Sequence, residues 1–329
     1  MNSLRPIGII GTGKYVPERI LTNSDLEKMV ETNDEWIVSR TGIRERHIAA
    51  EHEATSDLAY QAAIKALDSA GMKAEDLELI IVATITPDTS FPSTACILQD
   101  KLGAKGAAAF DLSAACSGFV YSLATATSFL QTGMYNNALI IGADTLSRIT
   151  DYTDRNTCVL FGDGAGAVVL GEVPQGRGFK SFDLGAEGAG GSLLKLEAGG
   201  SRLPASQQTL EEKKHFIYMN GREVFKFAVR VMGTATERVL EKAGLDKTDI
   251  DLFVPHQANI RIIQSAMQRL ELSEDKCVIN VDRYANTSAA SIPLALVEAA
   301  EEGRMKEGDT VLMVGFGGGL TWGASVLVW

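Results

Sequence analysis

The chain has 329 residues, of which 45% are hydrophobic and 22% are charged, so it can form one large α/β body or two core-sized units. Its net charge of −11 argues against a nucleic-acid partner. No apolar run reaches the length of a membrane span, and four cysteines without metal-ligand spacing favour a reducing, cytoplasmic setting and no metal site.

Strand and helix patterns alternate along the chain, which is typical of α/β architecture. The first strand pattern contains Gly8-Ile-Ile-Gly11-Thr-Gly13, which lacks the third glycine and the later acidic residue of a dinucleotide loop. Gly162-Asp-Gly-Ala-Gly166 lacks the Lys-Ser/Thr pair of a phosphate loop. We therefore interpret the first segment as a strand-end turn and the second as a tight turn beside the functional site.

One cysteine lies where a strand pattern gives way to a helix pattern. Cys116 occupies Asp111-Leu-Ser-Ala-Ala-Cys116-Ser-Gly118. A thiol at a helix start lies near unpaired N–H groups and the positive end of the helix dipole, which favour the thiolate. Because the thiolate is the nucleophilic form, Cys116 is the candidate nucleophile. Most free cysteines are small buried hydrophobes, so the residue needs partners to carry this prediction.

The second half of the chain repeats the first at an offset of 173 residues, 244 minus 71. Two pairs of segments share this offset: Ala70–Leu79 with Ala243–Leu252, and Leu139–Gly142 with Leu312–Gly315. In the first pair, each segment reads as a helix end capped by glycine, a short acidic connection and an apolar strand. We predict a diverged duplication with halves at residues 1–172 and 173–329.

The duplication suggests where the partners of Cys116 lie. His256 follows a strand pattern at 252–255, and Asn286 follows a strand-like run at 277–281. Ligands of open α/β sheets bind outside the carboxyl ends of strands, so packing of the two halves would bring Cys116, His256 and Asn286 together. A cysteine, a histidine and an asparagine in one site predict acyl transfer through a thioester.

Each half also contains one helix pattern that is almost apolar all round. These patterns cover residues 119–130 and 288–300. A helix that is apolar on every face is buried. We therefore predict both helices between two sheets, in a five-layered αβαβα sandwich.

Seven motifs together make the chain similar to a known family. They are Gly11-Thr-Gly-Lys-Tyr-Val-Pro17, the segment 34–46, the Cys116 segment, Phe161–Gly166, Val254-Pro-His-Gln-Ala-Asn259, Asn286-Thr-Ser-Ala-Ala290 and Phe316-Gly-Gly-Gly-Leu-Thr-Trp322. As a set they resemble β-ketoacyl-acyl carrier protein synthase III, the initiating condensing enzyme of bacterial type II fatty acid synthesis, with the thiolase fold. The resemblance covers essentially the whole chain and implies that Cys116, His256 and Asn286 form a catalytic triad.

This family performs a decarboxylating Claisen condensation. The resemblance implies that a short-chain acyl-CoA loads Cys116, and that malonyl-acyl carrier protein then gives 3-oxoacyl-acyl carrier protein. Acyl-CoA is a substrate, and no metal, nicotinamide or ATP is required. The backbone amides of Cys116 and Gly319 would form the oxyanion hole for loading. His256 and Asn286 would bind the malonyl enolate, because an asparagine side chain exchanges hydrogen bonds but not protons.

The resemblance also implies binding residues around the triad. Those expected to bind CoA are Trp36, Arg40, Thr41, Arg155, Gly221 and Asn259. Those expected to shape the acyl pocket are Leu160, Phe161, Ile217, Met219 and Phe225, with Phe91 from the other subunit of a homodimer. Those expected to bind the acidic carrier protein are Lys226, Arg261 and Arg269, and Arg230 fits an ordinary mixed-charge helix face equally well.

Related enzyme classes differ at readable positions. No histidine follows His256, so the second histidine of the elongating synthases is missing, and Cys277 in a strand-like run is a poor thiolase base. Chalcone-synthase-like enzymes share the Cys-His-Asn set, so an acyltransferase of secondary metabolism is the alternative. A non-catalytic partner subunit would need none of the three residues. The starter acyl group stays open, because acetyl and branched chains differ by a few methylenes, worth ~1–3 kcal/mol in a pocket.

Overall fold

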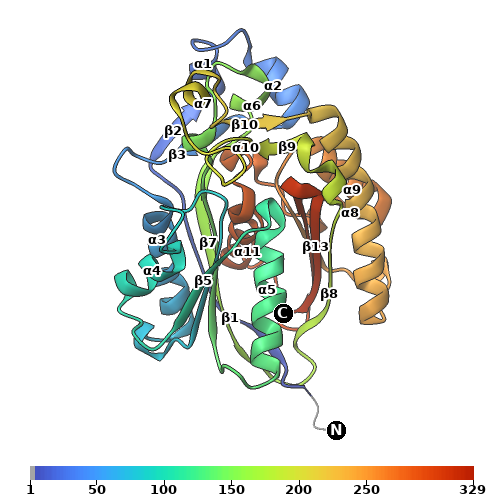
Figure 1. Cartoon of the computed structure of the whole chain (residues 1–329). Coiled ribbons are helices and arrows are strands. Elements are labelled where there is room, and N and C mark those ends of the chain that lie inside the picture. The colour runs from blue at the N-terminus through green and yellow to red at the C-terminus, as the bar shows by residue number, and fades with distance from the viewer. Residues whose placement is uncertain (1–3) are drawn as a thin grey trace.

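The computed structural model describes residues 4–329. Two β-sheets stand side by side with helices between them and outside each (Figure 1). The helices of the three layers are α3 (Thr55–Ala70) and α4 (Thr94–Leu102), then α5 (Gly118–Gln131) and α11 (Ser291–Glu301), then α8 (Gly221–Ala243) and α9 (Ile260–Leu270). This is the predicted αβαβα sandwich.

The two sheets share one pattern of strand directions. The first has the order β1 (Ile7–Tyr15), β7 (Asp163–Glu172), β6 (Ala138–Thr145), β4 (Leu79–Ala83) and β5 (Ala108–Leu112). The second has the order β8 (Gly178–Ala186), β13 (Thr321–Val328), β12 (Thr310–Gly317) and β11 (Leu252–Pro255). The pairs β4–β6 and β11–β12 are parallel, and the next pairs in each sheet are antiparallel.

The remaining elements lie around the top of the sheets in Figure 1. They are β2 (Arg19–Thr22), α1 (Asn23–Leu26), α2 (Asp34–Thr41), β3 (Glu45–Ile48), α6 (Arg155–Cys158), β9 (Leu194–Leu196), α7 (Gln207–Glu211), β10 (Ile217–Met219) and α10 (Val281–Tyr284). Short 3-10 turns precede the two central helices: η2 (Ala115–Ser117) before α5 and η7 (Ser288–Ala290) before α11. A third, η8 (Gly318–Leu320), joins β12 to β13.

The apolar helix patterns are confirmed as the central layer. Phe119 and Leu123 of α5 and Ile292 and Leu296 of α11 pack in one core between the sheets. The predicted glycine caps are also confirmed, because Gly71 ends α3 and Gly244 ends α8, both in the left-handed conformation. No helix among residues 4–329 is long and apolar enough to span a membrane.

The first glycine segment that we interpreted as a turn lies within β1, and all of the second except Gly162 lies within β7. Gly11 and Gly13 lie inside β1, where an added Cβ would approach the carbonyl oxygens of α3 to 2.4 and 2.3 Å. Gly166 lies inside β7, where an added Cβ would lie 2.7 Å from the Cβ of Pro293 in α11. These glycines let a helix press against a strand, which is why the turn interpretation was wrong.

The strand-like run at 277–281 is not a strand. Cys277 makes a single parallel bridge with Phe253, and Val281 already begins α10. The side chain of Gln257 donates to the carbonyl of Val278 and accepts from the amide of Asn280, at 3.0 Å each. This one side chain satisfies the backbone groups that a ladder would otherwise use, so the second sheet has no fifth strand.

Candidate active site

Cys116 lies in a strained turn at the carboxyl end of β5. It belongs to η2, immediately before α5, and is 8% exposed. The preceding Ala115 has a φ of +48°, a left-handed conformation that is costly for a residue with a Cβ. Ala285 and Ser288 beside Asn286 have φ values of +56° and +51°, so strained backbone flanks two triad positions.

The second sheet contacts the Cys116 turn directly. An added Cβ on Gly317, the last residue of β12, would lie 2.5 Å from the Cys116 amide nitrogen. The Ser117 hydroxyl also donates to Thr321 at the start of β13, at 2.8 Å. Gly317 therefore has no room for a side chain, and the two halves hold the turn from both sides.

His256 follows β11 and is 1% exposed. Its Nδ1 lies 2.5 Å from the Ser291 hydroxyl, and Ser291 also accepts the amide N–H of Gln257 at 3.4 Å. The Ser291 hydroxyl accepts from Gln257 and still has its own proton to donate; we assign that proton to Nδ1, which leaves the ring N–H on Nε2. Burial lowers the pKa of His256 to about 3, so the ring is neutral at physiological pH.

Asn286 is held by hydrogen bonds of its backbone and of its side-chain oxygen. Its N–H donates to the carbonyl of Leu160 at 2.9 Å, and its own carbonyl accepts from Gly162 at 3.0 Å. The side-chain Oδ1 accepts the N–H of Ser288 at 2.9 Å. The NH₂ group makes no hydrogen bond within residues 4–329, so it is a fixed donor available to a substrate.

The position of Cys116 at a helix start favours the thiolate, but burial of the residue disfavours it more strongly. Burial raises the pKa of Cys116 to about 12, and the nearby Asp144 carboxylate raises it further. The nearby Ser288 hydroxyl and the cysteine's own backbone lower the pKa of Cys116, but by less than burial raises it. The resting residue is therefore a thiol, and its proton must leave as the substrate is attacked.

Two cavities meet at Cys116. The first measures about 410 Å³, and the second measures about 100 Å³. The first contains Gly319 and a group of aliphatic side chains, whereas the second contains His256 and Asn286. Cys116, Phe161 and Leu194 line both.

The residues expected to form the acyl pocket divide between these cavities. Ile217 lines the first, whereas Leu160, Met219 and Phe225 line the second. Phe91, in the connection between β4 and α4, lines neither cavity and is 85% exposed. The structure adds Ile85, Leu146, Ile149 and Leu196 to the first cavity; the alternating strand patterns gave no signal for them.

The residues expected to bind CoA lie near the second cavity or on the neighbouring α2. Gly221 and Asn259 line that cavity at the first turns of α8 and α9. The guanidinium groups of Arg40 and Arg155 lie 4.5 and 4.7 Å from the centre of the Trp36 ring. Thr41 is buried, and its hydroxyl donates to the Ile37 carbonyl within α2.

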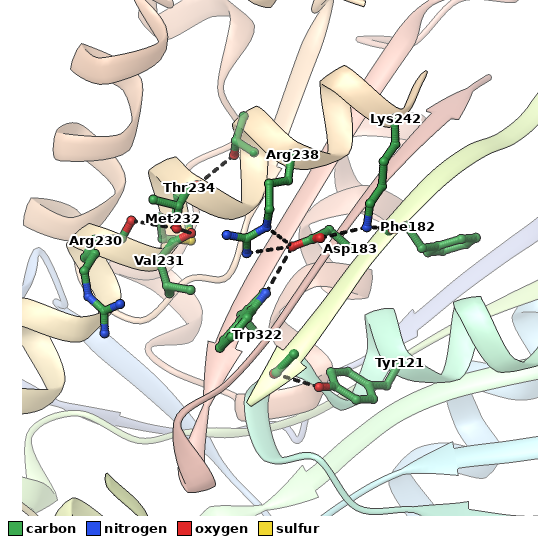
Figure 2. Close-up of polar contacts among 12 residues, drawn as sticks. Tyr121, Phe182, Asp183, Arg230, Val231, Met232, Thr234, Arg238, Lys242 and Trp322 are labelled. Carbon is green, nitrogen blue, oxygen red and sulfur yellow. Dashed lines mark hydrogen bonds and ion pairs between the residues drawn. The ribbon is translucent and has the colours of Figure 1, made fainter. Parts of the chain in front are cut away.

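The basic residues expected to bind a carrier protein differ in their partners. Lys226 pairs with Glu223, Arg230 with Glu187 and Arg269 with Glu237. Figure 2 shows two further cations of α8, Arg238 and Lys242, both paired with the buried Asp183 of β8. Arg261 makes no ion pair within residues 4–329; its guanidinium donates to the backbone carbonyl of Ser39.

Sequence reasoning missed the polar residues behind the triad. Asp144, at the end of β6, is fully buried and accepts from Thr84, Ile85, Thr86 and Ala289. Glu298 in α11 accepts from Asn280, Arg283 and Tyr284, in and beside α10, and so fixes the segment that leads to Asn286. The sequence gives little signal for these carboxylates, because their partners are distant in the chain.

Two family models match the parts of the chain that contain Cys116, His256 and Asn286. The model for 3-oxoacyl-[acyl-carrier-protein (ACP)] synthase III matches residues 110–188, and the model for its C-terminal part matches residues 240–329. β-Ketoacyl-[acyl-carrier-protein] synthase III of Desulfitobacterium hafniense is 59% identical over 98% of each chain. That of Caldanaerobacter subterraneus is 60% identical over 98% of this chain and 97% of the relative.

The chain belongs to the β-ketoacyl-acyl carrier protein synthase III family. The crystal structure of the synthase III from Thermus thermophilus matches with a TM-score of 0.92 and 53% identity, over 98% of this chain and 99% of that one. The synthase III from Aquifex aeolicus matches with a TM-score of 0.91 and 50% identity, over 98% and 100%. Both the resemblance and the thiolase-like fold are confirmed, and the chain is an acyltransferase of this family.

Proposed function

We propose that this synthase III condenses a short-chain acyl-CoA with malonyl-acyl carrier protein, with loss of CO₂, to initiate fatty acid synthesis. Family membership supports the reaction, and one structural observation supports the choice of residues. Cys116, His256 and Asn286 line a single small cavity, and Cys116 also lines a larger, mostly apolar cavity. A nucleophile between an apolar pocket and a pair of N–H donors suits an acylated intermediate that waits for an enolate.

Acyl transfer is the first step. The Cys116 sulfur bonds to the acyl carbon, the bond from that carbon to the CoA sulfur breaks, and the thiol proton leaves with CoA. The amides of Cys116 and Gly319 are the proposed donors to the tetrahedral oxyanion, and the left-handed φ of +74° at Gly319 is one that glycine adopts without strain. The first cavity then receives the acyl chain.

Decarboxylation and condensation follow in the second cavity. Loss of CO₂ from the malonyl group leaves its electron pair on the enolate, whose oxygen is the proposed ligand of His256 Nε2–H and the Asn286 NH₂. The enolate carbon attacks the acyl-Cys116 carbonyl, and the cysteine leaves as thiolate and takes a proton from solvent. A neutral His256 with Nε2–H suits donation to an enolate, because it does not need to titrate.

Substrate delivery uses the surface beside the second cavity. We assign CoA to Trp36, Arg40, Arg155, Gly221 and Asn259, since guanidinium groups bind phosphate and stack on aromatic rings. We leave Thr41 out, because its hydroxyl is already bonded inside α2. The acidic carrier protein is assigned to Arg261, with Lys226 and Arg269 as weaker contributors because each has an acidic neighbour.

The assembly is part of the proposal. The exposed Phe91 supports a homodimer in which this ring contributes to the partner's acyl pocket. The two sheets support division into halves at 1–172 and 173–329, and four free cysteines support a reducing cytoplasm.

The test is a reconstituted reaction with separately measured half-reactions. Acetyl-, isobutyryl- and isovaleryl-CoA are each incubated with the protein, and peptide mass spectrometry should place the acyl group on Cys116. Malonyl-acyl carrier protein is then added, and 3-oxoacyl-acyl carrier protein and CO₂ should appear together. Acylation of Cys96, Cys158 or Cys277, or product formation without malonyl groups, would overturn the proposal.

A second function within the fold has one specific support. The priming β-ketosynthase of the R1128 polyketide pathway matches with a TM-score of 0.92 and 33% identity, over 100% of this chain and 97% of that one. That identity is well below the 59–60% shared with synthase III relatives. The acyl-CoA panel also distinguishes this alternative, since efficient chain initiation from short starters favours fatty acid synthesis.

A further inference from the structure

One buried hydroxyl near the nucleophile is not used by the mechanism above. Ser288 is 1% exposed and lines the first cavity together with Cys116. Its Oγ makes no hydrogen bond of full geometry within residues 4–329. An orphan hydroxyl at such depth is costly unless the site uses it at some stage of the reaction.

The backbone holds Ser288 in place against strain. Its φ of +51° is left-handed, and its N–H is held by the Asn286 side chain at 2.9 Å. The next residue, Ala289, donates its N–H to Asp144 at 3.2 Å. Its carbonyl lies so close to β6 that an added Cβ on Gly142 would approach it to 2.1 Å. Three separate contacts therefore fix the backbone that carries this hydroxyl between β6 and the Cys116 turn.

We propose that Ser288 is the hydrogen-bond donor to the sulfur of Cys116 when that sulfur carries negative charge, and that it turns toward Asp144 when the thiol is protonated. The hydroxyl lies near enough to lower the pKa of both Cys116 and Asp144. The Ser288 hydroxyl makes no hydrogen bond to Cys116 or to Asp144 in this structure, so it is free to alternate between them. The proposal rests on Cys116 being the nucleophile of the proposed function.

The charged and titratable groups around the sulfur make such a donor necessary. Asp144 faces it from β6 and opposes the thiolate, and the neutral His256 faces it from β11. Lys195 of β9 lies in the same cavity wall, but its amine pairs with Glu197. The Ser288 hydroxyl is a buried donor without a competing partner, and His256 Nε2–H, the other such donor among these groups, is assigned to the enolate. The Ser288 hydroxyl therefore acts when thiolate forms during loading and again when Cys116 leaves after condensation.

The test measures the sulfur directly and does not depend on condensation. Wild-type protein and the variants Ser288→Ala and Ser288→Gly are treated with iodoacetamide between pH 7 and 10, and alkylation of the Cys116 and Cys96 peptides is followed by mass spectrometry. Loss of a hydrogen bond to a charged group should slow Cys116 alkylation on the order of tenfold at each pH. The exposed Cys96 should react at the wild-type rate and serves as the internal control.

A matched variant separates this role from packing. Thr287 is equally buried and its hydroxyl also lacks a partner, but it does not line the cavity of Cys116. Thr287→Val should leave the alkylation of Cys116 unchanged. Ser288→Gly guards against misfolding, since glycine adopts the left-handed φ without strain, and thermal melting of each variant checks the fold.

Three outcomes would overturn the proposal. Unchanged Cys116 alkylation in both folded Ser288 variants would exclude a bond to the sulfur, even if condensation fell. Equal slowing in Thr287→Val would make the effect one of packing. Slowing of Cys96 to the same degree would make it a general change in the protein. If instead Cys116 alkylation responds as expected but no acyl group loads onto it, the proposed function fails while the thiolate donor stands.

Discussion

The two cavities that meet at Cys116 are built for different kinds of binding. The first, about 410 Å³, offers aliphatic walls and glycine backbone. The second, about 100 Å³, offers the fixed N–H groups of His256 and Asn286. An apolar wall binds in proportion to buried area and tolerates chains of several shapes. Hydrogen-bond donors held in fixed positions stabilise negative charge only where it develops beside them, so the small cavity is suited to stabilising the enolate.

The two cavities also differ in what supports them. The aliphatic side chains of the first come from strand ends and loops and need no special partners. The polar residues of the second depend on hydrogen bonds with Ser291, Ser288 and Leu160, and on strained backbone beside Asn286. Substitutions in the first should therefore shift selectivity, whereas those in the second should remove a step.

The largest effect is expected at Cys116, the proposed nucleophile, which lines both cavities. Cys116→Ala removes the nucleophile, so acyl loading and condensation should fall on the order of 10⁴-fold or more. Intact-protein mass after incubation with acetyl-CoA measures loading. Cys96→Ala is the control, because Cys96 is exposed on α4 and should not matter. Residual loading at wild-type rate in Cys116→Ala would place the nucleophile elsewhere.

The second largest effect should separate the two half-reactions. Asn286→Asp keeps an acceptor for the Ser288 amide but loses the NH₂ donor. Release of CO₂ from malonyl-acyl carrier protein should fall on the order of 10²–10³-fold, whereas loading of Cys116 should stay near the wild-type rate. Asn286→Ala should lose decarboxylation too. Parallel losses in both half-reactions for Asn286→Asp would mean that the cavities do not divide the chemistry.

The sequence predicted the position of a site residue best where a chemically suitable side chain lies near the end of a strand. Cys116 lies four residues after the end of β5 and His256 directly follows β11, and ligand sites of α/β sheets gather at such strand ends. Asn286 lines a cavity with Cys116 and His256 although the strand expected before it does not exist; there the Gln257 side chain makes hydrogen bonds to backbone groups of the run. A glutamine side chain that hydrogen-bonds backbone groups more than 20 residues away leaves no recognisable pattern in the local sequence.

The rest depends on contacts between remote segments. Gly11 and Gly166 look like turn residues, yet they sit inside strands because a helix packs against them at close range. Ser291 is 35 positions from the histidine that it orients, and the sequence does not single it out from other serines. The expected thiolate failed for the same reason, since burial depends on the whole fold and outweighs the helix start.

A smaller effect, on selectivity, is expected in the first cavity. Ile217→Phe adds a ring to its wall, so loading from isovaleryl-CoA should fall about 10- to 100-fold relative to loading from acetyl-CoA. Initial rates of loading from the two substrates give this ratio. Ile20→Phe, the same change at an exposed isoleucine of β2, should leave the ratio unaltered. A uniform loss with both substrates would instead indicate damage to the catalytic turn.

The free energy of unfolding should depend on pH at acid values, because His256 in the second cavity is buried in its neutral form. His256 has a folded pKa of about 3, below its usual value of 6.5, so between these values the unfolded chain binds a proton that the folded protein does not. Stability should therefore fall as pH drops through this window, by up to about 1.4 kcal/mol per pH unit from this residue. Denaturant titrations should show that slope reduced in His256→Gln and retained in His52→Gln. Equal slopes in all three proteins would show that His256 titrates normally.

The smallest effect is expected outside both cavities, at the carrier surface. Arg261 lies at the start of α9 without an ion-pair partner in residues 4–329, whereas Arg230 is paired with Glu187. Arg261→Glu should raise the KM for malonyl-acyl carrier protein about three- to tenfold and leave loading from acyl-CoA nearly unchanged, because exposed charges contribute modestly. Arg230→Glu, with the same charge change, should have the smaller effect. The wild-type KM should rise with salt, since exposed charges are screened beyond about 8–10 Å. A change in acyl-CoA loading with an unaltered carrier KM would assign Arg261 to CoA, and the carrier protein would then have to bind through other residues.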